Sequence, residues 1–126
     1  DVCSSDLSRD AVILKEDFEK AGCRVILCTD DGSAGFRGLV TEPLRKVLEE
    51  PKDVVLACGP GPMLKGVAEE AEARGVPCQI SLEERMGCGV GACLVCACKI
   101  KKADGEEAYL HVCKDGPVFN AEEVVF

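Results

Sequence analysis

The chain has 126 residues, 47% of them hydrophobic and 30% charged, which is the balance of a globular protein with one ordinary domain or two very small ones. No apolar run approaches the roughly 18 residues needed to span a bilayer. A net charge of −8 and only 4% aromatic residues argue against nucleic acid as a partner. Ten cysteines are the unusual feature, and their positions carry most of the functional argument.

Residues 1–10 are polar and show no apolar periodicity. They contain no initiator methionine, and their first seven residues resemble a translated sequencing adapter. We therefore expect this segment to be disordered or an artefact, and the natural protein to extend upstream.

Residues 15–82 are predicted to alternate helices with strands. A first helix begins at Lys15, with Gly22 suited to its C-terminal end. A second is capped by Thr41 and has Pro43 in its first turn, and a third opens at Pro62. Short apolar runs predict strands at 24–28, 53–57 and 77–82. Strands joined by helical crossovers indicate an α/β fold built on part of a doubly wound parallel sheet.

Two loops, residues 29–33 and 58–62, each follow a predicted strand. Ligands of doubly wound sheets lie beyond the carboxyl ends of the strands, so both loops are candidates for a nucleotide site. Their Gly and Pro content is equally typical of simple tight turns. The chain has no G-x-G-x-x-G motif to decide between the two interpretations.

After Glu83 the pattern changes to a glycine- and cysteine-rich loop followed by β-type segments at 94–101 and 109–112. We therefore predict three parts: the irregular residues 1–10, an incomplete nucleotide-binding domain at 11–83, and a small β-rich domain at 84–126.

The last five cysteines lie in the third part of the chain. Cys88, Cys93 and Cys96 have C-x4-C-x2-C spacing, and Cys113 follows at a distance, as in plant-type [2Fe–2S] proteins. Each iron of such a cluster takes two thiolates, and glycines in the loop let backbone N–H groups turn toward the sulfides.

Other uses of these cysteines remain open. Zinc usually takes a second C-x2-C or Cys/His pair, which is missing here, and a Rieske centre needs two histidines where the chain has only His111. Cys98 shares a strand face with Cys96 and is an alternative third ligand. Four further cysteines beside apolar runs are expected to pack in the core: Cys23, Cys28, Cys58 and Cys78.

Four motifs together resemble one family, the electron transfer subunit of NAD-dependent dihydroorotate dehydrogenase. They are Thr29-Asp-Asp-Gly-Ser, Cys58-Gly-Pro-Gly-Pro-Met-Leu, Glu84-Arg-Met-Gly-Cys-Gly-Val-Gly-Ala-Cys and Val112-Cys-Lys-Asp-Gly-Pro-Val-Phe. The likeness runs from about Ala11 to Phe126. It implies a ferredoxin reductase-like NAD domain followed by a 2Fe–2S domain.

The resemblance also implies the cofactors and their residues. Cluster ligands would be Cys88, Cys93, Cys96 and Cys113. NAD would be approached by Cys58, Gly59, Pro60 and Met63, with Asp30 and Asp31 near its adenosine ribose. No catalytic residue is assigned.

The implied function is an electron relay in pyrimidine biosynthesis, in the cytoplasm. Electrons would pass from the FMN of a dihydroorotate-oxidising partner through the cluster to FAD and NAD+, in an assembly of two plus two subunits. The FAD barrel of the family is missing, so we expect the chain alone to be inactive. The alternatives are a subunit of an NAD(P)-ferredoxin or sulfide reductase, which often has Asp where this chain has Cys88, and a non-catalytic zinc module.

Overall fold

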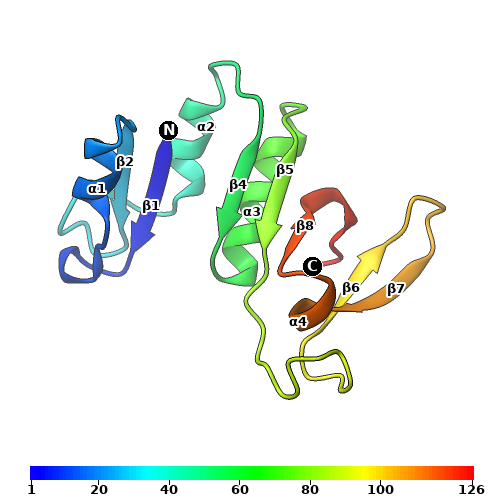
Figure 1. Cartoon of the computed structure of the whole chain (residues 1–126). Helices are drawn as coiled ribbons and strands as arrows, with labels where there is room; N and C mark the ends of the chain where they lie inside the picture. The colour runs from blue at the N-terminus through cyan, green and yellow to red at the C-terminus, as the bar shows by residue number, and fades with distance from the viewer. The chain divides into compact units, whose positions relative to one another are not determined.

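The computed structural model describes residues 1–126 and divides them into two compact units, Asp1–Pro51 and Lys52–Phe126. Figure 1 shows the elements of both units. Helices accompany small sheets, one parallel, one mixed and one antiparallel, which confirms the predicted α/β class. No helix has the length and apolar character that a membrane span requires.

The N-terminal unit is built on a three-stranded parallel sheet in the order β1–β2–β3. Its strands are β1 (Val2–Asp6), β2 (Val25–Thr29) and β3 (Phe36–Arg37), and its helices are the 3-10 turn η1 (Arg9–Ala11), α1 (Lys15–Lys20) and α2 (Thr41–Val47).

Strand β1 differs from the disorder expected for residues 1–10. It pairs with β2 along all five of its residues. Two hydrogen bonds of 2.6 and 2.9 Å join the Arg24 guanidinium to the Asp1 carboxylate beside this pairing. The strand is thus defined by its neighbour rather than by an apolar pattern of its own, and composition alone could not reveal it.

The helices of this unit begin and end close to the predicted positions. Helix α1 is followed by Gly22 with φ +83°, the left-handed conformation expected after a helix. Helix α2 begins at Thr41, but its N-cap residue is Val40, which is already helical, and no side chain caps the helix. The predicted cap at Thr41 is therefore wrong, because that residue lies inside the first turn.

The C-terminal unit contains two sheets. Strands β4 and β5 are parallel and are connected through helix α3, and β8 adds to β5 in the antiparallel direction. Strands β6 and β7 form an antiparallel hairpin. The elements are β4 (Val55–Cys58), α3 (Gly61–Glu72), β5 (Cys78–Ser81), β6 (Ala97–Lys101), β7 (Glu107–His111), α4 (Val112–Asp115), β8 (Val118–Asn120) and the 3-10 turn η2 (Ala121–Glu123).

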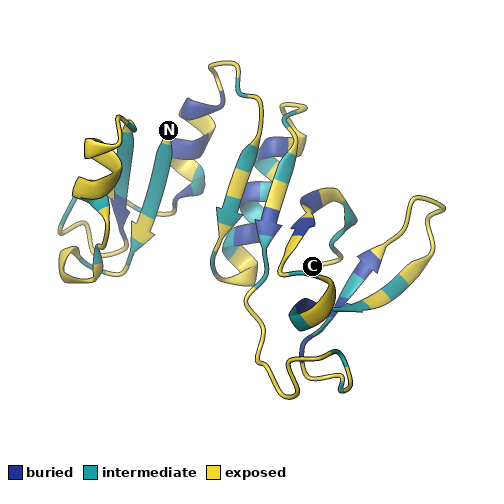
Figure 2. Ribbon diagram, viewed as in Figure 1, coloured by how far each residue is buried: buried dark blue, intermediate teal, exposed yellow.

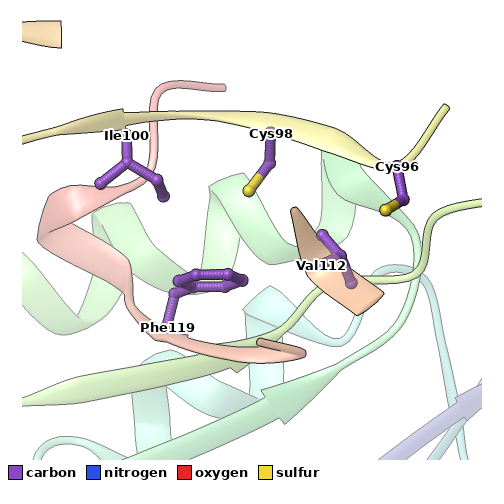
Figure 3. Close-up of a cluster of buried hydrophobic side chains, with 5 residues drawn as sticks. All are labelled: Cys96, Cys98, Ile100, Val112 and Phe119. Carbon is purple, nitrogen blue, oxygen red and sulfur yellow. The ribbon is translucent and has the colours of Figure 1, made fainter. Parts of the chain in front are cut away.

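Two clusters of buried side chains stabilise this unit, and Figure 2 shows how burial alternates along its strands. Leu64 of α3, Ile80 of β5 and Ala121 of η2 form the first cluster. The second joins one face of β6 to α4 and β8 and consists of Cys96, Cys98, Ile100, Val112 and Phe119 (Figure 3). Leu82 and Val124 pack against both clusters.

The division into units does not follow the domain limits expected from the sequence, 11–83 and 84–126. Strand β8 lies in the same sheet as β5, and Ala121 packs with Leu64 and Ile80. Residues near the C-terminus therefore complete a sheet and a buried cluster whose other members precede residue 83. The predicted domain limits stay a prediction.

Candidate metal centre and nucleotide loops

The loop between β5 and β6 carries the first three candidate metal ligands. Within it the N–H groups of Val90 and Ala92 donate hydrogen bonds to the Cys88 sulfur, at 3.5 and 3.2 Å. Hydrogen bonds from the backbone of Val90, Cys93 and Ala92, and from the Cys93 thiol, lower the pKa of Cys88 to about 6. The loop thus holds Cys88 in a conformation that favours its thiolate, the form that binds metal.

The four candidate cysteines make contact as two pairs. The Cys93 thiol donates to the Cys88 sulfur. The Cys113 thiol, from α4, donates to the sulfur of Cys96, which directly precedes β6. That hydrogen bond, together with burial, raises the pKa of Cys113. One pair therefore lies within the loop, and the other joins the end of the loop to a helix 17 residues further along the chain.

Glycines make the loop tight enough for these contacts. A Cβ atom at Gly87 would lie 3.0 Å from Cγ2 of Val95 and 3.1 Å from Sγ of Cys93. Gly89 and Gly91 have φ values of +70° and +78°, which side chains rarely permit. The side chain of Val95 is thus accommodated because residue 87 has no side chain.

The arrangement fits a two-iron cluster better than a single metal ion. No group of three or more His, Cys, Asp or Glu side chains is placed around one metal position. In a [2Fe–2S] cluster each iron takes two thiolates, so two pairs of cysteines are what such a cluster requires. Backbone N–H groups directed at sulfur add the hydrogen bonds that an anionic cluster needs.

Cys98 occupies a different environment from the paired cysteines. It is 8% exposed within the second buried cluster, and its thiol donates to the Leu110 carbonyl of the facing strand at 3.6 Å. Figure 3 shows Cys98 pointing from β6 toward the ring of Phe119. The structure thus pairs Cys113 with Cys96 and gives Cys98 a packing role.

The four cysteines expected in the core divide into three groups. Cys28 is fully buried, and Cys23 and Cys78 are half-buried. Cys58 is exposed at the end of β4, so the expectation of core packing is wrong for this residue. Because alternate residues of a strand face opposite sides, the exposed Cys58 shares its face with the exposed Leu56.

The loop that follows β4 is shaped by a glycine. Gly59 has φ +148°, and a Cβ atom there would lie 2.6 Å from Cε of Met63. The Pro60 carbonyl accepts hydrogen bonds from Met63 and Leu64 at 2.9 and 3.0 Å, which starts helix α3 directly after the loop. Four of the predicted NAD-binding residues, Cys58, Gly59, Pro60 and Met63, therefore lie within one strand–loop–helix turn at the carboxyl end of a parallel strand.

Glu83 joins this loop and was not singled out from the sequence. Its carboxylate accepts a hydrogen bond from the Cys58 thiol at 3.6 Å. Glu83 follows β5 closely, and β4 and β5 are parallel neighbours, so both residues lie at the same edge of the sheet. The position just after a parallel strand was the signal that could have identified it.

The other two predicted NAD-binding residues belong to the N-terminal unit. Asp30 and Asp31 are exposed directly after β2. The Asp31 carboxylate accepts a hydrogen bond of 2.9 Å from the Ser33 N–H, and hydrogen bonds from Ser33 hold the pKa of Asp31 below its ordinary value. Their proposed place beside the ribose of NAD stays a prediction.

Comparison with known proteins identifies the family. Residues 83–125 match the iron-sulfur cluster binding domain of dihydroorotate dehydrogenase B. The "Dihydroorotate dehydrogenase B (NAD(+)), electron transfer subunit" of Caldanaerobacter subterraneus subsp. tengcongensis is 51% identical over 113 residues, which cover 90% of this chain and 44% of that relative. The subunit of the same name from Geobacillus thermodenitrificans is 48% identical over 121 residues, covering 94% and 44%. The chain belongs to this family.

A solved structure extends the comparison to the fold. The NADH-dependent reduced ferredoxin-NADP oxidoreductase, described in connection with flavin-based electron bifurcation, superposes with a TM-score of 0.78 at 32% identity, covering 98% of this chain and 43% of that chain. The predicted reductase-like fold class is thereby confirmed. This chain spans less than half the length of each of these relatives.

Proposed function

We propose that this chain is part of the electron transfer subunit of an NAD-dependent dihydroorotate dehydrogenase. It would hold a 2Fe–2S cluster and bind NAD, in a relay between the FMN of a dihydroorotate-oxidising partner and the FAD and NAD+ of its own subunit. The observation that carries the proposal is the pairing of Cys88 with Cys93 and of Cys96 with Cys113, inside the segment that matches the family's iron-sulfur domain.

The residues of this chain would have distinct parts in the relay. The four paired cysteines would bind the two irons, and the N–H groups of the loop would stabilise the negative charge of the thiolates and sulfides. A cluster held there would supply one-electron transfer. The Cys58–Met63 turn, with Glu83 beside it, would receive the nicotinamide end of NAD. FAD would be bound by a part of the longer protein that this chain does not include.

The same proposal gives the partners and the setting. The partner would be the FMN-containing catalytic subunit, in an assembly of two copies of each subunit, working in pyrimidine biosynthesis in the cytoplasm. Mass photometry of the complete subunit with its catalytic partner would test the stoichiometry. A mass equal to one copy of each would contradict the two-plus-two assembly.

Spectroscopy tests the metal centre first. We expect the anaerobically purified chain to contain about two irons, to absorb visible light, and to give a rhombic EPR signal after reduction with dithionite. Cys88→Ala and Cys113→Ala should each abolish the chromophore, whereas Cys23→Ala, a half-buried cysteine of the other unit, should retain it. Zinc without a chromophore in the parent chain would overturn the relay and support the zinc-module alternative.

Electron donors test the reaction. With the catalytic subunit present, dihydroorotate should reduce the cluster of this chain, and the EPR signal should appear without dithionite. A ferredoxin reductase-type subunit is the second candidate, because the solved structure that superposes on this chain is an oxidoreductase of that kind. Reduction by ferredoxin together with no response to dihydroorotate would favour that candidate.

A further inference from the structure

The cysteine-bearing loop meets helix α4 at Gly91 and Lys114. A Cβ atom added to Gly91 would lie 2.7 Å from Cδ of Lys114 and 3.2 Å from its Cβ. Real Cβ atoms essentially never approach another heavy atom within 3.0 Å. The aliphatic stem of Lys114 therefore fills the space that any side chain at position 91 would need.

A second contact joins the same loop residue to the same helix. The backbone N–H of Gly91 donates a hydrogen bond to the sulfur of Cys113, the residue immediately before Lys114. Two consecutive residues of α4 thus contact Gly91, one through sulfur and one through a hydrocarbon stem. Gly91 lies between Cys88 and Cys93, so this contact connects the first cysteine pair to the helix that supplies the fourth cysteine.

We infer that Lys114 is a positioning residue for the iron–sulfur site. Its stem holds the loop against α4 and so fixes the separation between the Cys88–Cys93 pair and the Cys96–Cys113 pair. The inference rests on the proposed function, because that separation matters only if both pairs bind one two-iron cluster. Residues that orient metal ligands typically change metal affinity by 10–100-fold when they are mutated.

Lysine suits this position because its two ends have different properties. Lys114 is exposed as a whole, yet its methylene groups cover the Gly91 backbone. Lysine commonly packs its hydrocarbon stem on a surface while its ammonium group stays in water. The stem and the charge can therefore be separated by substitution, since methionine keeps most of the stem and removes the charge.

The first experiment compares stem and charge. The parent chain, Lys114→Met and Lys114→Ala are loaded with the cluster, and two quantities are measured: the rate of cluster loss to a chelator, from the visible absorbance, and the midpoint potential. We expect Lys114→Ala to lose its cluster about tenfold faster than the parent and to shift in potential. Lys114→Met should retain the cluster nearly as well as the parent. Equal behaviour of Lys114→Ala and the parent, or equal damage in both variants, would overturn the inference.

The second experiment uses a matched pair of glycines. Gly89 and Gly91 both have left-handed φ values, but a Cβ atom at Gly89 would meet nothing within 4 Å. Gly89→Ala therefore reports backbone strain alone, while Gly91→Ala adds the collision with Lys114. We expect Gly91→Ala to lose its cluster faster than Gly89→Ala, and Lys114→Ala in the Gly91→Ala background to recover part of the difference.

The outcomes separate this inference from the proposed function. A parent chain that binds no iron would refute the proposed function itself. A parent that holds the cluster, with no difference between the two glycine variants and no recovery in the double variant, would refute only the role of Lys114. Far-UV circular dichroism of each variant shows whether cluster loss precedes loss of the fold.

Discussion

The ring of Phe119 lies directly against Gly116. A Cβ atom at Gly116 would be 2.5 Å from Cε2 and 2.8 Å from Cζ of that ring. Phe119 belongs to the buried cluster that also contains Cys96 (Figure 3), and Gly116 follows the helix that carries Cys113. The packing of one aromatic ring therefore links the surroundings of both members of the second cysteine pair.

Gly116→Ala should destabilise the C-terminal unit. Residue 116 has φ −114°, outside the left-handed region that favours glycine, so we expect the cost to come from displacing the ring. Overpacking of this kind typically costs about 1–3 kcal/mol. Urea unfolding of the cluster-loaded protein measures it. Gly61→Ala is the control, because a Cβ there meets nothing within 4 Å and the residue lies in helix α3. Equal midpoints for the two variants would contradict the prediction.

Cys98→Ala should keep the visible spectrum and lower stability by about 1 kcal/mol. The Cys98 thiol is buried and donates to the Leu110 carbonyl, so its removal leaves a small void and takes away this one hydrogen bond in the hairpin. Absorbance, iron content and thermal unfolding together test this. The comparison variant is Cys96→Ala, which should lose the chromophore. A colourless Cys98→Ala protein would show that Cys98 is a ligand.

Gly59→Ala should weaken the NAD binding proposed for this turn. The new methyl group would collide with Cε of Met63, and residue 59 has a backbone conformation that disfavours side chains. Cys58 is exposed in the same turn, so bound NAD+ should slow its alkylation, read out at this residue by mass spectrometry. We expect protection in the parent and less in the variant. Gly75→Ala, at the other end of α3 and with open space at its Cβ, should keep the parent's protection.

If the proposed catalytic subunit is the partner of this chain, Leu94→Glu should weaken their association by about tenfold or more, as at a buried interface position. Four apolar side chains of the cysteine-bearing loop are more than half exposed: Met86, Val90, Leu94 and Val95. Such residues favour docking by apolar contact, which depends little on salt. Biosensor titration at two ionic strengths measures both effects. Leu56→Glu is the control, since Leu56 is 71% exposed but lies on β4. Similar losses for both variants would argue against docking through the loop.

The local pattern of apolar and turn residues was sufficient to predict those helices and strands whose own side chains are buried. Strands β4 and β5 lie at the predicted apolar runs, and helix α3 ends before Gly75, as expected. The cysteine spacing identified the loop between β5 and β6 as the candidate metal site. Contacts between distant residues could not be predicted in this way. Neither the Gly91–Lys114 contact nor the Cys96–Cys113 hydrogen bond leaves a periodic signal, because each joins residues that are far apart in sequence.

The dependence on contacts between distant residues also explains why the predictions for residues 1–10 and for Cys58 were wrong. Strand β1 is polar and exists through its pairing with β2, so its composition was uninformative. Cys58 follows an apolar run, but the alternation of β4 places it on the exposed face. A thiol's sequence neighbours indicate the element in which it lies, whereas the side of the sheet depends on register.

The antiparallel pairing of β8 with β5 limits how the cysteine-bearing segment can be transplanted into another protein. A cut at residue 83 would follow the start of the family-domain match, yet it would remove β8 from the sheet of β4 and β5 and expose the backbone edge of β5 to other chains. The excised piece would carry β8 without β5, the strand with which it pairs. The segment that carries the cysteines therefore cannot be exchanged on its own. A chimera should take its donor sequence from Lys52 onward, where the compact unit begins.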